Sequence, residues 1–195
     1  MSDPSSFIGG TPGGLRGLSD LIEHLRAHSL KTDGPYRLRS GEISDWYLDA
    51  RQSTFDGQGS LLVGDAMLSV LADGVQAVGG MTMGADPIAV ATAGRAAATG
   101  RTMKAFSIRK ETKGHGTGGR VVGPVRAGDR VTVVEDTTTT GGALTEAIEV
   151  AGGHGLKVVQ AVALVDRSGG RVTGLLADLG IPYRCLLTPA DLGLA

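Results

Sequence analysis

The chain has 195 residues, of which 41% are hydrophobic, 32 are glycine and 1 is cysteine, and its formal net charge is -1 at pH 7. This length and composition are typical of a globular protein with one domain and a substantial core. They exclude an internal disulfide and a membrane-spanning apolar stretch, and they give no electrostatic basis for broad binding of nucleic acids or anionic membranes.

The N-terminal residues 1–17 are rich in Gly, Ser and Pro and contain few residues that could enter a core. We expect them to form a flexible extension, followed by a single domain over residues 18–195. The segment lacks the basic start and apolar stretch of a secretory signal, so we expect a cytoplasmic protein.

Apolar residues at helical spacing begin at Leu18 and continue to Leu25, which predicts a helix capped by Ser19 and ending near His28. The next stretch, YRLRSGEISDWYLDAR, alternates on both sides of its central Ser-Gly pair. This pattern predicts a hairpin or two short strands outside the main sheet. Residues 18–55 would thus form most of a small hood.

A helix is expected near residues 61–71, and after it short apolar strands alternate with helices. The strand candidates are VQAVGG, MKAFSI, RVTVVED, LKVVQAVALVD and YRCLL, and the helix candidates are PIAVATAGRAAAT, GALTEAIEVA and RVTGLLADL. This alternation predicts an α/β fold whose mainly parallel sheet is covered by helices on both faces. Ligands of such sheets bind at the carboxyl ends of the strands.

The stretch VVEDTTTTGG carries two adjacent acids, Glu135 and Asp136, between an apolar strand and a predicted helix. We interpret it as a strand-to-helix loop whose backbone N–H groups and threonine hydroxyls hold a phosphate. The acids could accept hydrogen bonds from ribose hydroxyls or hold Mg²⁺. Solvated loop acids are the alternative for the pair alone. The lysine of a Walker A motif is absent, which disfavours a nucleoside triphosphatase.

A second cluster, RKETKGHGTGGR, gathers Arg109, Lys110, Lys113, His115 and Arg120 around several glycines. It is either a solvated charged loop or an active-site lid that closes over a polyanion and stabilises charge on a leaving group. Three of its glycines match G-x-G-x-x-G. No helix is expected after them, so we reject a nicotinamide or flavin cofactor.

Two more features lie at predicted strand ends. The loop GGMTMGADPIAV could hold a second anionic group at a helix start, or it could be a tight turn whose methionines fill the core. Arg167 follows the strand AVALVD, where its guanidinium could pair with a substrate carboxylate. Alone, it could equally be an ordinary surface arginine.

These motifs resemble a known family. VVEDTTTTGG is similar to the phosphoribosyl pyrophosphate signature of the type I phosphoribosyltransferases. SIRKETKGHGTGG, LRSGEISDWYLDAR, GGMTMGADPIA and IPYRCLLTPADLGL resemble segments of the orotate phosphoribosyltransferases, so the resemblance covers nearly everything after residue 18.

The resemblance implies a type I phosphoribosyltransferase fold with a small N-terminal hood. It also implies a Mg²⁺-dependent glycosyltransferase (pentosyltransferase) that converts orotate and 5-phosphoribosyl 1-pyrophosphate into orotidine 5'-monophosphate and pyrophosphate, in de novo pyrimidine biosynthesis. A purine-type phosphoribosyltransferase and a non-catalytic phosphoribosyl pyrophosphate sensor are the alternatives, although the basic loop and Arg167 argue against them.

Roles for single residues also follow from the resemblance. The catalytic residues would be Arg109, Lys113, His115 and Asp136. Orotate would be bound by Tyr47, Leu48, Thr139 and Arg167. The phosphoribosyl donor would be bound by Arg39, Arg109, Lys110, Lys113, His115, Glu135, Asp136, Thr137, Thr138, Thr139, Thr140, Gly141, Gly142 and Ala143.

The resemblance further implies that Mg²⁺ is held mainly through substrate and water, with Asp86 or Asp136 as possible protein ligands. Because the mobile loop of this family partly serves the neighbouring subunit, a homodimer with a shared active site is expected. Two positions depart from the family pattern: Arg39 replaces a lysine of some relatives, and Asp86 stands where some relatives are basic.

Overall fold

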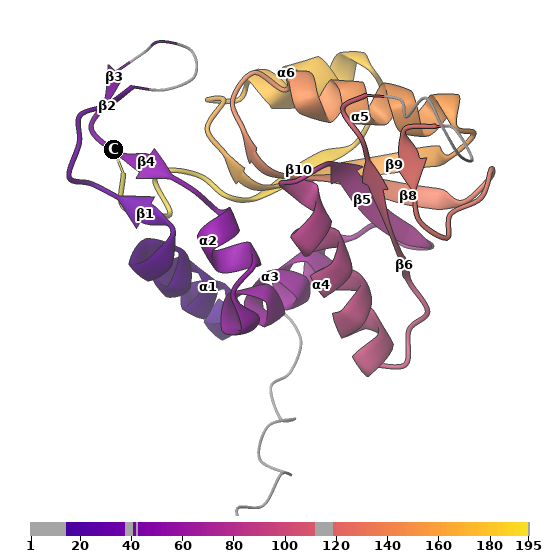
Figure 1. The fold of residues 1–195 in the computed structure, drawn as a ribbon, viewed down its shortest axis with the longest axis horizontal. Coiled ribbons are helices and arrows are strands. Elements are labelled where there is room, and N and C mark those ends of the chain that lie inside the picture. The colour runs from indigo at the N-terminus through magenta and orange to yellow at the C-terminus, as the bar shows by residue number, and fades with distance from the viewer. Residues whose placement is uncertain (1–14, 38–40, 42, 112–118, 195) are drawn as a thin grey trace, which may run out of the picture.

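The computed structural model describes residues 15–37, 41, 43–111 and 119–194, and its centre is a six-stranded sheet (Figure 1). The strands lie in the order β10-β9-β8-β5-β6-β7. Their bounds are β5 (Ala77–Met81), β6 (Lys104–Ile108), β7 (Val121–Val122), β8 (Arg130–Thr138), β9 (Lys157–Asp166) and β10 (Tyr183–Leu187). All neighbouring pairs are parallel except β6 and β7. The predicted mainly parallel sheet is confirmed, and the antiparallel edge strand β7 is an addition to it.

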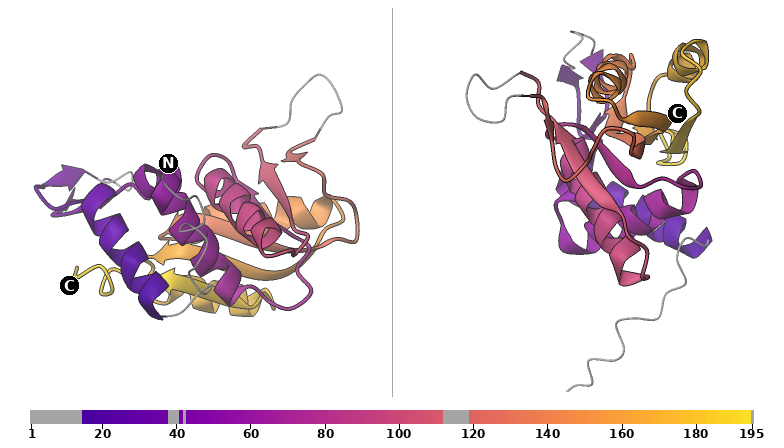
Figure 2. Two further views of the ribbon diagram at one scale, coloured as in Figure 1. Left: turned by 90° about the horizontal axis from the view of Figure 1, so that it is seen from below. Right: turned by 90° about the vertical axis from the view of Figure 1, so that its right-hand side faces the viewer.

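Helices cover both faces of this sheet (Figures 1 and 2). On one face lie α3 (Gly57–Val70) and α4 (Ala85–Ala98), and on the other α5 (Gly142–Gly153) and α6 (Arg171–Asp178). The helix predicted near residues 61–71 begins earlier, at Gly57, because the carboxylate of Asp56 caps it by accepting a hydrogen bond from Gly59 N at 2.9 Å.

The core is divided by the sheet, as the period of two along a strand requires. Val134 and Val162 point to the side of α3 and α4, whereas Val133 and Ala161 point to the side of α5 and α6. Since every residue of β5 is buried, the middle of the sheet is apolar on both faces. The sheet is therefore a rigid platform whose polar residues stand at the strand ends.

The hood is built from α1 (Leu15–His28), α2 (Arg51–Thr54) and four two-residue strands. These are β1 (Leu30–Lys31), β2 (Tyr36–Arg37), β3 (Ile43–Ser44) and β4 (Tyr47–Leu48). The predicted hairpin is present as the antiparallel pair β2 and β3, and β4 pairs with β1. The prediction that Ser19 caps the first helix is wrong, because α1 begins four residues before it.

The C-terminal segment completes the hood, which the sequence did not indicate. Arg26 on α1 donates from Nε to the carbonyl oxygen of Leu192 at 3.0 Å, and Leu192 is buried beside Leu21 and Leu25. Figure 1 shows the end of the chain lying beside β1 and β4. Most of the predicted extension, residues 1–14, lies outside the described residues. Among the described helices, none is long and apolar enough to cross a membrane.

Candidate functional site

The adjacent acids Glu135 and Asp136 lie in the second half of β8. The predicted strand RVTVVED already contains both acids, but the prediction that the loop begins directly behind them is wrong, because β8 stays paired with β9 as far as Thr138 and the loop begins only at Thr139. The pairing of β8 with its other neighbour β5 ends at Val133. The two acids thus stand on a rigid strand where the sheet opens on one side.

Burial raises the pKa of both carboxyl groups in this acid pair. Burial, together with the negative charge of Asp136, raises the pKa of Glu135 from 4.5 to about 8. Burial also raises the pKa of Asp136, although the backbone N–H of Thr137 and the positive charge of Arg51 act in the opposite direction. Among the described residues, no group forms a hydrogen bond with Oε2 of Glu135. The pair therefore requires a bound proton, hydroxyl donors or a cation.

The loop after β5 packs directly against Asp136. A Cβ atom at Gly84 would come within 2.5 Å of Oδ1 of Asp136, so only glycine leaves room for the carboxylate. Thr82 Oγ1 donates to Oδ2 of Asp86 at 2.7 Å, and Asp86 lies in the first turn of α4 together with Pro87, as expected. The prediction that the methionines of this loop fill the core holds for Met81, which is buried, and is wrong for Met83, which is 57% exposed. Anion binding at this helix start stays a prediction.

The remaining hydroxyl-rich residues lead into α5. Thr139 and Thr140 are exposed, and Gly141 adopts a left-handed φ of 83° as the residue before the helix. Gly141 itself has no side chain that could cap this helix start. Gly142 and Ala143, both exposed, open the first turn. The backbone N–H groups of the turn and the positive end of the helix dipole are therefore available to an anion.

The basic cluster is rooted at the end of β6. Arg109 N donates to the carbonyl oxygen of Arg120 at 2.8 Å, and Arg120 Nε donates to the carbonyl oxygen of Arg109 at 2.7 Å. A salt bridge joins Arg120 to Glu146 of α5. Lys110 is exposed. The predicted site residues Lys113 and His115 lie outside the described residues, as does Arg39 of the hood, but both ends of the loop that carries Lys113 and His115 are held at the site.

The residues predicted to bind orotate come from two sides. Arg167 follows β9, and its backbone N–H donates to the carbonyl oxygen of Thr138 at 2.8 Å. From the hood, Tyr47 is half-buried, whereas Leu48 is 6% exposed and packs into the core. The guanidinium carbon of Arg167 lies 3.8 Å from the ring centroid of Trp46, a hood residue that sequence reasoning did not select.

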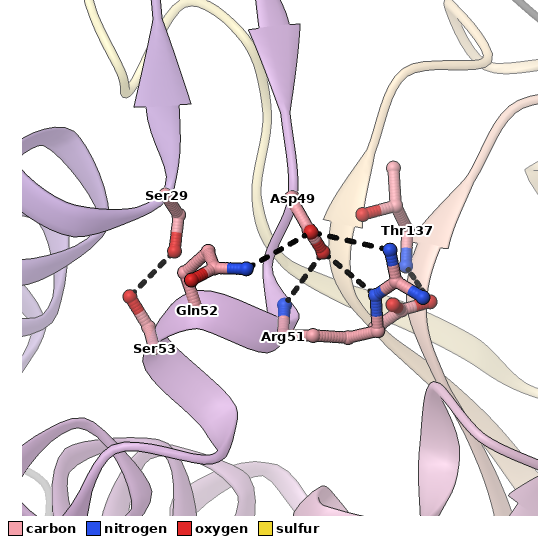
Figure 3. Close-up of polar contacts among 7 residues, drawn as sticks. Ser29, Asp49, Arg51, Gln52, Ser53 and Thr137 are labelled. Atoms are coloured by element: carbon pink, nitrogen blue, oxygen red, sulfur yellow. Dashed lines mark hydrogen bonds and ion pairs between the residues drawn. The ribbon is translucent and has the colours of Figure 1, made fainter.

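Arg51 is a second residue that sequence reasoning missed. Its Nε and Nη2 donate to the two oxygens of Asp49 at 2.7 and 3.1 Å, a bidentate pair (Figure 3). Figure 3 shows its guanidinium pointing toward Thr137 of β8, next to the acid pair. The acids of β8 could have suggested a cationic partner, but the chain contains 19 lysines and arginines. Only the packing of the hood selects Arg51 from them.

Oxygen atoms at this edge suit a magnesium ion. Oδ1 of Asp86 and Oε2 of Glu135 are buried and accept no hydrogen bond from the described residues. Carboxylate oxygens are ligands that Mg²⁺ prefers, usually one or two of them together with substrate and water. Within the described parts of the chain there is no group of three or more His, Cys, Asp or Glu side chains that could hold a metal alone. The donor set thus fits an ion that is held mainly by a bound ligand.

Comparisons with known proteins agree on one family, although no family model matches the chain. It is 46% identical over 162 residues to the orotate phosphoribosyltransferase of Streptomyces avermitilis, a match that covers 83% of this chain and 89% of the relative. A crystal structure of Mycobacterium tuberculosis orotate phosphoribosyltransferase superposes with a TM-score of 0.80 at 38% identity, covering 91% of this chain and 99% of that one. The same enzyme in complex with 5-phospho-α-D-ribosyl 1-diphosphate gives a TM-score of 0.75 at 36% identity, with coverage of 91% and 99%.

Proposed function

The chain belongs to the orotate phosphoribosyltransferase family and has its type I phosphoribosyltransferase fold, and from this premise we propose what it does. It transfers the phosphoribosyl group of 5-phosphoribosyl 1-pyrophosphate to orotate, giving orotidine 5'-monophosphate and pyrophosphate on the route to UMP. Residues 18–195 act as one phosphoribosyltransferase domain behind the N-terminal extension. The observation that carries this proposal is the acid pair of β8, which lies beside an uncapped helix start and a close-packed glycine loop.

The donor is bound along β8 and the start of α5. Glu135 and Asp136 accept hydrogen bonds from the ribose hydroxyls, which supply a donor to the buried Oε2 of Glu135. The 5-phosphate is bound by the hydroxyls and N–H groups that follow. These belong to Thr137, Thr138, Thr139, Thr140, Gly141, Gly142 and Ala143.

The pyrophosphate is bound by the basic loop. Arg109 and Lys110 stand at its root, and Lys113 and His115 complete it when it closes. Support comes from the two hydrogen bonds between the ends of this loop, which keep it beside the donor site. Arg39 contributes a further cation from the hood. Positive charge delivered to a site without bulk water stabilises the departing pyrophosphate strongly.

The acceptor is bound between β9 and the hood. Arg167 pairs with the carboxylate of orotate, Thr139 binds the ring, and Tyr47 and Leu48 cover it. Because Leu48 itself is buried in the core, its contribution is a fixed backbone and an apolar wall. Uracil and the purine bases have no carboxylate, so Arg167 would discriminate against them.

Asp86 or Asp136 would help to hold a Mg²⁺ ion that is bound mainly by the donor and water, and the ion would supply positive charge that stabilises the departing pyrophosphate. The protein itself aligns the reactants. A ring nitrogen of orotate forms a bond to the anomeric carbon of the donor while the bond from that carbon to the pyrophosphate oxygen breaks. The transition state resembles an oxocarbenium ion, as in glycoside cleavage, and no nucleophilic side chain is required.

We propose a homodimer with a shared active site as the working unit, located in the cytoplasm. The apolar side chains of Met83, Val90 and Val122 are 57%, 64% and 40% exposed. Val90 and Val122 line one hollow of about 160 Å³ at α4, β6 and β7, the side of the sheet from which the basic loop leaves. An exposed apolar patch of this kind suits a protein interface. The lone Cys185 is compatible with a reducing compartment.

The test is the ultraviolet absorbance change when the purified protein meets orotate, 5-phosphoribosyl 1-pyrophosphate and Mg²⁺, with uracil and hypoxanthine as parallel bases. We expect consumption of orotate alone. Turnover of hypoxanthine instead would indicate a purine-type enzyme. Donor binding without turnover of any base would indicate a sensor, and either result would refute the proposal.

A further inference from the structure

Trp46 and Arg167 link the hood to the acceptor end of the sheet. The guanidinium carbon of Arg167 lies 3.8 Å from the centroid of the indole ring, and both residues are half-buried. A cation over the face of tryptophan at this distance is a favourable cation–π contact, and arginine adds flat stacking to it. The contact joins Trp46, which lies between β3 and β4 of the hood, to Arg167, which directly follows β9 of the sheet.

The backbones on both sides of this contact are fixed. Trp46 lies in a turn where the hydroxyl of Ser44 donates to its carbonyl oxygen at 2.8 Å. Beside Arg167, the carboxylate of Asp166 accepts hydrogen bonds from Ser168 N at 2.6 Å and from the hydroxyl of Tyr183 at 3.0 Å. Asp166 itself is only 7% exposed. The stacked side chains therefore extend from two rigid supports.

Stacking leaves the guanidinium suited to bind a carboxylate. Its N–H donors lie in the plane of the group and point outward from its edges, whereas the indole covers one face. A carboxylate is bound bidentately through an edge. Because the long arginine side chain otherwise loses rotamer freedom on binding, a guanidinium that is already held by an aromatic ring binds with a smaller entropy cost.

We propose that Trp46 is a positioning residue for the acceptor: it holds the guanidinium of Arg167 in the orientation that receives the carboxylate of orotate. This inference rests on the proposed function, since it assigns the carboxylate of the acceptor to Arg167. Tyr47 and Leu48 of the hood cover the orotate ring directly, whereas Trp46 acts on orotate through its contact with Arg167. The hood thereby contributes to the choice of substrate as well as covering it.

The kinetic test compares Trp46→Leu, which removes the aromatic face and keeps apolar bulk, with Trp46→Phe, which keeps a face. We expect Trp46→Leu to raise the KM for orotate by roughly 5- to 30-fold, the range that a cation–π contact of ordinary strength predicts. The KM for 5-phosphoribosyl 1-pyrophosphate should stay within about twofold, which also shows that the variant is folded. Trp46→Phe should restore most of the orotate KM. An equal rise in both KM values, or none, would overturn the proposal.

The second test needs no catalysis. Trp46 is the only tryptophan in the chain, so the lifetime of its fluorescence reports on the stack, and lifetimes are insensitive to absorption by orotate. We expect Arg167→Leu to change the lifetime in the free protein, and orotate to change it in the parent protein but not in Arg167→Leu. An identical lifetime in the parent and in Arg167→Leu would show that the stack is absent in solution and refute the inference. Failure of the proposed function would be seen separately, as a parent protein that does not consume orotate.

Discussion

Gly84 lies directly against Asp136, so that a Cβ atom at position 84 would stand 2.5 Å from Oδ1 of the carboxylate. The atoms in its way belong to the end of the Asp136 side chain, and the φ of Gly84 is -63°. An alanine would therefore displace the carboxylate and leave the backbone intact. We expect Gly84→Ala to weaken binding of the phosphoribosyl donor by roughly tenfold or more, about 1.4 kcal/mol, measured by calorimetry.

The matched control is Gly94→Ala, within α4, the helix that Gly84 directly precedes. Nothing lies within 4 Å of a Cβ atom at Gly94. Because alanine favours the helix over glycine, this variant should bind the donor normally and gain about 0.5 to 1 kcal/mol in its free energy of unfolding. Equal donor affinity in the two variants would contradict a role for the Gly84 contact.

The buried acid pair predicts how stability varies with pH. In the folded protein the pKa of Glu135 is raised to about 8, so the folded state holds this proton more tightly than the unfolded state. The resulting stability is fully present below about pH 4.5 and is lost as the pH rises toward 8. At about 1.4 kcal/mol per pKa unit, the free energy of unfolding should fall by on the order of 3 to 5 kcal/mol over this window.

Glu135→Gln isolates this contribution, because a glutamine remains neutral throughout. We would measure urea unfolding at several pH values between 5 and 8.5. As the pH rises, the free energy of unfolding of the variant should increase relative to that of the parent protein. Titrating groups that do not interact with Glu135 cancel in the difference, whereas its neighbour Asp136 is coupled to it and contributes to the change. A difference that is independent of pH would show that Glu135 is ionised in the folded state across the whole range.

We expect Arg51 to affect binding of the phosphoribosyl donor, because its positive charge acts on the carboxyl group of Asp136. Its positive charge lowers the pKa of that carboxyl group, so Arg51→Ala should leave more of Asp136 protonated. Donor affinity should then fall more near pH 6 than near pH 8, because the higher pH returns more of Asp136 to its charged form. Calorimetric titration at both pH values measures this.

Gln52→Ala is the control for Arg51, since Gln52 lies on the same short helix and also donates to Asp49, at 3.2 Å, but carries no charge. It should bind the donor like the parent protein at both pH values. Arg51→Lys keeps the charge and loses the bidentate pair, so we expect an intermediate affinity. If Arg51→Ala and Gln52→Ala bound the donor with the same affinity at both pH values, Arg51 would act by supporting the structure of the hood and not through its charge.

Lys113 is predicted to supply the largest part of the charge that stabilises the leaving pyrophosphate. Lys113→Ala should lower kcat by about 10² to 10³-fold, by analogy with the removal of one donor from an oxyanion hole, with a smaller effect on donor binding. Lys157→Ala, an exposed lysine at the amino end of β9, is the control and should retain the parent rate. Near-native turnover by Lys113→Ala would refute the role.

The predictions from sequence were accurate where the signal was local. All strands of the parallel sheet lie where apolar runs predicted them, because the period of two and the flanking glycines are properties of neighbouring residues. Boundaries were less accurate. The start of α1 and the extension of β8 to Thr138 depend on packing and on pairing with β9, which a local pattern does not contain.

The sequence by itself determined the fold class, the order of its elements and the motif VVEDTTTTGG, since each depends on residue types at fixed short spacing. Only the tertiary structure decided which distant side chains meet. The contacts of Gly84 with Asp136 and of Trp46 with Arg167 join segments far apart in the chain. The physical reason is that burial and charge at the site arise from the packing of the hood and the strand ends, and no single segment carries that information.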